Sequence, residues 1–298
     1  MQYPRISLDQ WLAFKTVVDS GTYALAAESL NKSQSAISYA IANLNEQLPK
    51  PVLTLKGRKA ELTDEGAVLY RYAEQLISAA NAAEAVAKSL AMGFEAEVVI
   101  AVDVLVQVSS LVCCFEQFSQ GFPHTRIRVL ETSLSGTTEA LLEKQADIVI
   151  SSITPTGFNG RPVGDITMVP VAAPSHPLIA NRAEVSEFEL RSHRQVVLRD
   201  TGTKRKVDAG WLASQQRWTV SHFSTSIELV KSGLAFAFIP SKWVATALEK
   251  QELELIPLNQ GFERRLPLYL LFSDQDSAGP ATKALATLSG DYLRASPT

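Results

Sequence analysis

Long apolar runs and a large excess of one charge are both missing from this 298-residue sequence. No stretch reaches the roughly 18 apolar residues that a membrane helix needs, and polar residues with an acid stand where a signal peptide would be apolar. A composition of 46% hydrophobic and 20% charged residues excludes a disordered chain. We therefore expect a cytoplasmic globular protein with no membrane partner, and the length favours two or more domains.

Cysteine and histidine are scarce, which limits the chemistry available to the chain. Cys113 and Cys114 are adjacent, a spacing that suits neither a long disulfide loop nor a four-ligand zinc site. The four histidines are scattered, and no glycine-rich phosphate loop or nucleophile motif occurs. The sequence thus predicts no metal, no cofactor and no enzyme. We interpret both thiols as buried core side chains, with a redox switch as the alternative.

The charge is distributed unevenly between the two ends of the chain. Residues 1–61 hold seven Lys or Arg and five Asp or Glu, a net +2, and the remaining 21 basic and 26 acidic residues give −5. Because a surface needs local rather than overall positive charge to meet phosphates, the N-terminal end could bind nucleic acid.

Three short helices are predicted at the N-terminus. Ser7 with Gln10 has the spacing of a capping box, and Gly21 ends the helix that it starts. A second helix over 23–30 is rich in alanine, and Ser33 caps a third whose apolar face is Ala36, Ile37, Ala40, Ile41, Leu44 and Leu48. The last two helices form a helix-turn-helix candidate. A protein-interaction domain is the alternative.

A β-hairpin is expected after Pro49 and Pro51. Residues 52–55 and 60–62 have strand character and flank a basic turn at 56–59. Such a hairpin beside a helix-turn-helix is a wing, so we define residues 1–62 as a winged helix-turn-helix domain dominated by helix.

A long helix is predicted over 63–93, with Thr63 as its cap and acids in its first turn. Leu69, Leu76, Ala83 and Leu90 recur every seven residues, and Tyr72 occupies a second position of the same repeat. This pattern favours pairing with a second copy of the chain through these five residues. A helix packed on its own chain is the alternative.

Strands and helices alternate over residues 94–298, which predicts an α/β fold with parallel strands. We expect lobe I to comprise about 94–160 and 266–298, and lobe II about 161–265. Two lobes joined by two crossings leave a cleft, where such sheets tend to bind ligands.

The N-terminal motif resembles the signature of LysR-type transcriptional regulators. It comprises Ala26-Ala27, Leu30, Ser33-Gln34-Ser35-Ala36-Ile37-Ser38, Ile41, Leu44, Leu62-Thr63 and Gly66. The segments 174–178 and 233–240 resemble the same family, so the likeness covers the whole chain. It implies a winged helix-turn-helix domain, a linker helix, and a two-lobed effector domain similar to periplasmic binding proteins. It also implies a homodimer that commonly joins into a dimer of dimers.

The resemblance implies which residues meet DNA. The third helix would enter the major groove, where its free amides suit phosphate and Gln amides suit base edges. The candidate DNA contacts are Ser33, Gln34, Ser35, Ser38, Tyr39, Arg58 and Lys59. Leu55 stands where a wing arginine is typical, and we assign it no DNA contact.

By position, the effector would meet Asp103, Val104, Ser133, Thr201, Gly202, Phe223, Ser224 and Thr225. Family members use helix N-termini in the cleft, which favour anions. Asp103 departs from this pattern, because an acid disfavours a second carboxylate. It would meet a cation or a hydroxyl-rich ligand, or it caps the following helix and faces water.

The resemblance therefore implies a sequence-specific regulator that binds double-stranded DNA and responds to a small-molecule effector. Two rival functions stay open at this stage: a DNA-binding protein without an effector, and a solute-binding protein, which shares the two-lobed architecture. An enzyme is the remaining rival and lacks any catalytic motif.

Overall fold

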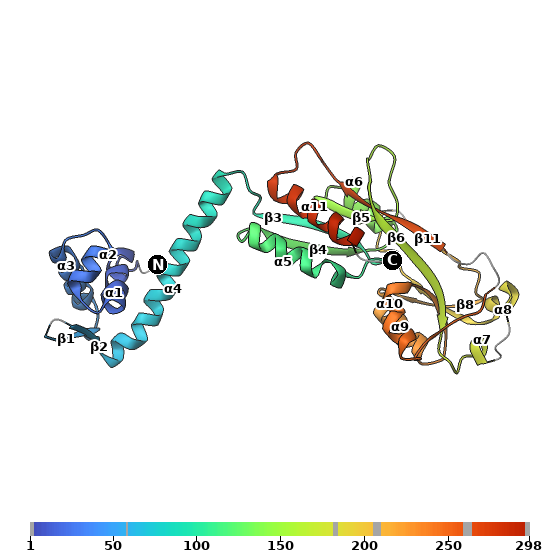
Figure 1. Ribbon diagram of the computed structural model, residues 1–298, viewed down its shortest axis with the longest axis horizontal. Helices are drawn as coiled ribbons and strands as arrows, with labels where there is room; N and C mark the ends of the chain where they lie inside the picture. The colour runs from blue at the N-terminus through green and yellow to red at the C-terminus, as the bar shows by residue number, and fades with distance from the viewer. Residues whose placement is uncertain (1–2, 58, 181–183, 205–209, 259–263, 296–298) are drawn as a thin grey trace. The chain divides into compact units, whose positions relative to one another are not determined.

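The computed structural model describes residues 3–57, 59–180, 184–204, 210–258 and 264–295 (Figure 1). The chain divides into two compact units, Met1–Ala91 and Met92–Thr298, and each is considered by itself. No helix among the described residues is long and apolar enough to cross a membrane.

The N-terminal unit contains the predicted helices and hairpin. Ser7 and Gln10 form the capping box: the Gln10 amide donates to Ser7 Oγ at 3.3 Å, and the Ser7 amide donates to Gln10 Oε1 at 2.7 Å. The elements are α1 (Leu8–Ser20), α2 (Tyr23–Ser29), α3 (Gln34–Gln47), β1 (Leu53–Lys56), β2 (Lys59–Leu62) and α4 (Asp64–Ala91). Local capping and periodicity were sufficient to predict all of them within a few residues.

A close backbone approach fixes the hairpin against the start of α4. A Cβ placed on Gly66 would lie 2.0 Å from the carbonyl oxygen of Val52. The Gly66 amide donates to Thr63 Oγ1 at 2.9 Å, so Thr63 caps the helix as predicted. Only glycine fits this position, which explains the glycine in the N-terminal motif.

The C-terminal unit is built around one continuous mixed sheet. Its order is β4-β3-β5-β11-β6-β9-β7-β8, and β10 pairs with β6. The strands are β3 (Glu97–Asp103), β4 (Arg126–Thr132), β5 (Ile148–Ser151), β6 (Arg161–Ala172), β7 (Arg194–Leu198), β8 (Gln216–Val220), β9 (Phe236–Pro240), β10 (Glu254–Leu255) and β11 (Arg264–Phe272).

Helices cover this sheet in two groups, which define two lobes. Lobe I carries η1 (Val108–Leu111), α5 (Val112–Gly121), α6 (Ser135–Leu142) and α11 (Pro280–Ala295). Lobe II carries α7 (Pro177–Ala180), α8 (Glu187–Ser192), α9 (Phe223–Lys231) and α10 (Ser241–Glu249). Helices were expected to alternate with strands here, but no individual helix of lobe II was predicted.

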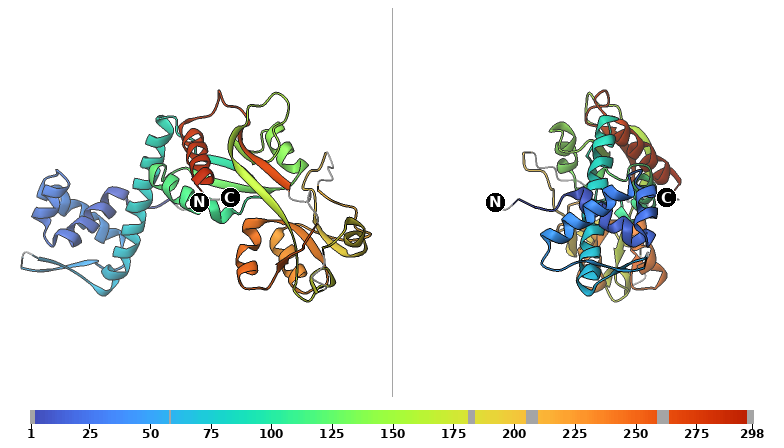
Figure 2. Two further views of the ribbon diagram at one scale, coloured as in Figure 1. Left: turned by 45° about the vertical axis from the view of Figure 1, so that its right-hand side comes forward. Right: turned by 90° about the vertical axis from the view of Figure 1, so that its left-hand side faces the viewer.

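The expectation of parallel strands holds only within each lobe. β3 pairs in parallel with β4 and β5, and β7 pairs in parallel with β8 and β9. The long strands β6 and β11 cross between the lobes side by side and are antiparallel (Figure 2). β6 begins at Arg161, about where lobe II was predicted to start. Two crossing strands therefore connect the lobes.

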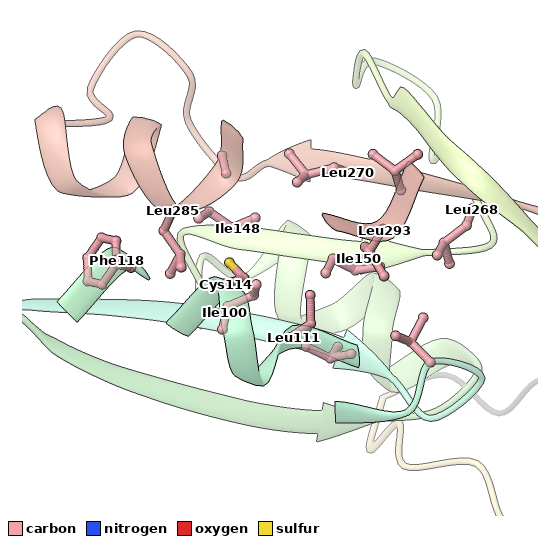
Figure 3. Close-up of a cluster of buried hydrophobic side chains, with 14 of the residues drawn as sticks. Ile100, Leu111, Cys114, Phe118, Ile148, Ile150, Leu268, Leu270, Leu285 and Leu293 are labelled. Atoms are coloured by element: carbon pink, nitrogen blue, oxygen red, sulfur yellow. The ribbon is translucent and has the colours of Figure 1, made fainter. Parts of the chain in front are cut away.

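Buried apolar side chains form the core of lobe I. Phe118 and Cys114 on α5 face Ile100 of β3 and Leu285 of α11 (Figure 3). The Cys114 thiol is buried, and burial raises its pKa. Cys113 is exposed, so the prediction that both thiols are buried is wrong for Cys113: adjacent residues of a helix point about 100° apart.

Candidate functional site

α3 exposes a polar face on the N-terminal unit. Its core-facing residues Ile37, Ile41 and Leu44 are at most 2% exposed. The candidate DNA contacts Gln34, Ser35, Ser38 and Tyr39 are all exposed on the other side. Tyr39 is 69% exposed, so its ring and hydroxyl are accessible to a binding partner.

Ser33 has a defined structural role at the start of α3. Its hydroxyl accepts from the Ala36 amide at 3.2 Å and lies 3.0 Å from Ser35 Oγ. Ser33 therefore caps the helix and holds its first turn, while the exposed hydroxyl of Ser35 lies beside it.

The turn of the hairpin projects from β1 and β2. Lys56 and Lys59 are exposed and are paired across the hairpin, and Lys56 forms an ion pair with Glu61 at 2.6 Å. Arg58 lies outside the described residues. Leu55 is 62% exposed, so the position where a wing arginine is typical carries an apolar side chain.

An apolar stripe runs along α4. Tyr72, Leu76 and Leu90 are 58%, 45% and 51% exposed, and Ala83 is exposed as well. Leu69 is half-buried against the core of its own unit, and Leu62 belongs to β2. Leu62 is seven residues before Leu69, so the seven-residue spacing begins in a strand and continues into α4, where only its part beyond Leu69 is open to a partner.

A cavity of about 550 Å³ lies in the C-terminal unit. Four of the predicted effector contacts line it: Asp103, Val104, Ser133 and Phe223. Asp103, Val104 and Ser133 come from the ends of β3 and β4 in lobe I, and Phe223 starts α9 in lobe II. The structure thus brings together residues more than a hundred positions apart.

Ser224, Thr225, Thr201 and Gly202 do not line this cavity. Ser224 and Thr225 follow Phe223 directly on α9 and are exposed. Consecutive residues of a helix point in different directions, so the prediction that three consecutive residues of α9 line the cavity is wrong for Ser224 and Thr225.

Thr201 connects the two lobes. Its hydroxyl accepts from the Ser133 amide at 2.8 Å and donates to the Ser133 carbonyl at 3.0 Å. A Cβ on Gly136 would lie 2.0 Å from Thr201 Oγ1, so glycine permits this contact. Thr201 therefore positions Ser133.

Asp200 occupies the N-terminus of α6. Its carboxylate accepts from the Ser135 amide at 3.1 Å and the Ser135 hydroxyl at 2.6 Å, and also from the Gly202 amide at 2.8 Å. Glu139, one turn along α6, accepts from the amides of Thr203 and Lys204 at 2.8 and 2.9 Å. Asp200 belongs to the loop after β7 and binds α6, and Glu139 belongs to α6 and binds the same loop. The two carboxylates therefore hold this loop of lobe II against α6.

Asp103 is 4% exposed, so it does not face water. Its Oδ1 accepts from the Leu105 amide at 3.0 Å, and its Oδ2 accepts from Thr137 Oγ1 at 3.2 Å. Burial raises the pKa of this carboxyl to about 6, although the two hydrogen bonds favour the charged form. The group lies in a cavity wall and keeps a charge near neutral pH.

Several lining residues were missed by the sequence analysis. They include Met168, Gln195, Trp211, Phe238 and Arg264. Gln195 is buried in β7 next to Val196, and a polar side chain in a buried strand was the one signal that could have identified it. No cluster of metal-ligating side chains occurs in the described ranges.

Two family models match the chain. The one described as "Bacterial regulatory helix-turn-helix protein, lysR family" covers residues 8–67, and the one described as "LysR substrate binding domain" covers residues 92–294. Together they contain α3, the hairpin and the cavity.

Curated relatives carry the same type of name. The HTH-type transcriptional regulator YeeY of Escherichia coli K12 is 29% identical over 238 residues, covering 78% of this chain and 77% of that protein. The HTH-type transcriptional regulator AceR of Acinetobacter baumannii is 25% identical and covers 97% of both chains.

Solved structures share the fold. The full-length regulator LysG from Corynebacterium glutamicum has a TM-score of 0.52 at 16% identity and covers 97% of this chain and 98% of that chain. CrgA from Neisseria meningitidis gives a TM-score of 0.51 at 20% identity, covering 96% and 97%. With a helix-turn-helix that exposes a polar face and a two-lobed domain enclosing a cavity, this chain belongs to the LysR family of bacterial transcriptional regulators.

Proposed function

We propose that the regulator contacts its operator with Gln34, Ser35, Ser38 and Tyr39 of α3, and with Lys59 and Arg58 of the hairpin. The observation that carries this proposal is the exposed polar face of α3 opposite its buried apolar face. Gln amides pair with base edges, hydroxyls bind phosphates, and lysine at the turn meets the backbone.

Replacement of Gln34 and Ser38 by alanine tests the assignment. We expect the Gln34→Ala/Ser38→Ala protein to bind DNA upstream of its own gene at least about tenfold more weakly, because one good base contact contributes about 1–3 kcal/mol of discrimination. Fluorescence anisotropy at fixed salt measures this, and Gln120→Ala, an exposed glutamine of α5, is the matched control. Unchanged affinity in the double variant would show that α3 contacts are misassigned.

Two copies of the chain pair through α4. The pairing residues are Tyr72, Leu76, Ala83 and Leu90, and Leu69 lies at the edge of the contact. Exposed apolar side chains on one helix support this, because apolar surface that recurs with heptad spacing is stabilised by burial against a second helix. Paired copies would place two recognition helices on successive faces of an interrupted palindrome. Boundaries at 62 and 93 divide the chain into DNA-binding, linker and effector-binding parts. As a DNA-binding regulator, the protein acts in the cytoplasm.

The cavity takes the effector. Its volume suits a small molecule, and its walls come from both lobes, so a ligand there would contact both. A solved structure of LysG is of that protein with its effector bound. Effector binding changes operator affinity only as far as the ligand prefers one arrangement of the protein over another.

A further inference from the structure

The helix N-terminus that could hold an anion is already occupied in this protein. Asp200 accepts from the amide and the hydroxyl of Ser135, and the Ser133 amide donates to Thr201. A ligand carboxylate would have to displace the protein's own carboxylate and hydroxyl. It would also enter next to Asp200 and Glu139, whose charges repel it.

Asp103 is among the residues that line the cavity, and its carboxylate is buried. Both of its hydrogen bonds come from neutral donors, the Leu105 amide and the Thr137 hydroxyl. Within the described part of the chain, no Lys, Arg or His forms an ion pair with it. A buried carboxylate that lacks a cationic partner is stabilised by any cation that enters beside it.

Gln195 adds an acceptor that also lacks a partner. Its side chain is 3% exposed and lines the cavity, and its Nε2 donates to the carbonyl of Trp211 at 2.8 Å. That bond orients the amide and leaves Oε1 without a hydrogen-bond partner among the described residues. A buried acceptor without a donor costs about 1–3 kcal/mol, which a ligand N–H can recover.

The rest of the lining is largely apolar and aromatic. Trp211, Phe223, Phe238 and Met168 supply flat or polarisable surface, to which a planar ligand and a cation are both attracted. Arg264 also lines the cavity, and it is an exposed residue at the start of β11, so water screens its charge.

We propose that the effector of this regulator is a cationic amine or amidine on a flat apolar body, with its charged N–H groups directed to Asp103 and Gln195. The inference rests on the proposed function of the cavity and adds the chemical class of the ligand. It runs against the anionic effectors that free helix N-termini favour.

Three probes that share one indole ring and differ in charge test the class. Isothermal titration calorimetry on the full-length protein compares tryptamine, tryptophol and indole-3-acetate at pH 7.5. We expect tryptamine to bind at least about tenfold more tightly than tryptophol, and indole-3-acetate to bind most weakly.

Two variants separate charge recognition from damage to the fold. In Asp103→Asn the new side chain can still accept from the Leu105 amide, so tryptamine should lose its tenfold preference while tryptophol keeps its affinity. Gln195→Met should weaken tryptamine and tryptophol alike. Asp276→Asn removes an exposed acid that does not line the cavity and should change neither affinity.

The outcomes distinguish this inference from the function on which it rests. Tighter binding of indole-3-acetate or tryptophol than of tryptamine overturns the cationic class and leaves the cavity as an effector site. Equal loss of tryptamine and tryptophol affinity in Asp103→Asn overturns the role of the charge. If none of the three probes binds at millimolar concentration, the inference fails, while DNA binding by α3 is still decided by the operator titration.

Discussion

The two units of this protein place their functional residues in different ways. In the N-terminal unit the candidate contacts are neighbours in sequence on one helix face, between Gln34 and Tyr39. In the C-terminal unit the cavity collects residues from Asp103 to Leu266, and sequence neighbours such as Phe223 and Ser224 separate. A site on one helix follows the helical period, whereas a site between lobes depends on long-range strand pairing.

The largest effect is expected where the N-terminal unit meets a second copy. A Leu76→Asp/Leu90→Asp protein places two charges in the apolar stripe of α4, which should separate the dimer and lower operator affinity about a hundredfold or more, since both half-sites are then bound independently. Analytical ultracentrifugation and anisotropy measure the two quantities.

Gln75→Asp, at an exposed α4 position outside the proposed pairing residues, is the matched control for that experiment. A double variant that stays dimeric at micromolar concentration would refute the assignment of this stripe to pairing.

Next in size is the close contact that holds the hairpin to α4. Gly66→Ala should lower the free energy of unfolding by about 3 kcal/mol, because its Cβ would overlap the Val52 carbonyl and the backbone must shift. Gly121→Ala, which meets nothing within 4 Å, should change it by less than about 1 kcal/mol. Urea denaturation of both proteins checks the difference, and equal stabilities would mean that the hairpin moves aside at little cost.

The third effect concerns the buried charge of the C-terminal unit. A carboxyl whose folded pKa is raised binds its proton more tightly when folded, so the stability it contributes is present at low pH and is lost as pH rises from about 4 to about 6. Asp103→Asn should therefore stabilise the protein at pH 7.5 by about 3 kcal/mol, using 1.36 kcal/mol per pKa unit.

That gain should disappear near pH 4, where the wild-type carboxyl is protonated as well. Chemical denaturation at the two pH values gives the comparison. A variant less stable than wild type at pH 7.5 would mean that the hydrogen bonds of Asp103 outweigh the cost of burying its charge.

The same contrast explains how much the sequence could predict. Capping by Ser7, Ser33 and Thr63 and the 3.6-residue period defined the N-terminal unit, because these signals act within a few residues. The strands of the C-terminal unit could be placed, but their directions could not. Whether β6 and β11 run antiparallel depends on pairing between segments about a hundred residues apart, which leaves no local pattern.

The cavity was predictable only in part for the same reason. Asp103 ends β3 and Ser133 follows β4, and these two neighbouring strands are parallel, so their carboxyl ends meet at one edge of the sheet. Gln195 of β7 and Trp211, which precedes β8, reach the cavity from lobe II, and no local pattern marks them as lining residues. The predicted contact Thr201 connects the lobes instead of lining the cavity, as does its neighbour Asp200, which was not predicted.

One titration tests most directly the claim that the N-terminal unit binds the operator and the C-terminal unit binds the effector. Operator affinity is measured by anisotropy with and without tryptamine for wild type, Gln34→Ala/Ser38→Ala and Asp103→Asn. We predict that tryptamine changes the operator affinity of wild type, that the α3 variant binds DNA weakly under both conditions, and that Asp103→Asn binds DNA normally but no longer responds. The account would be contradicted if the α3 variant bound the operator as tightly as wild type and tryptamine left the operator affinity of wild type unchanged.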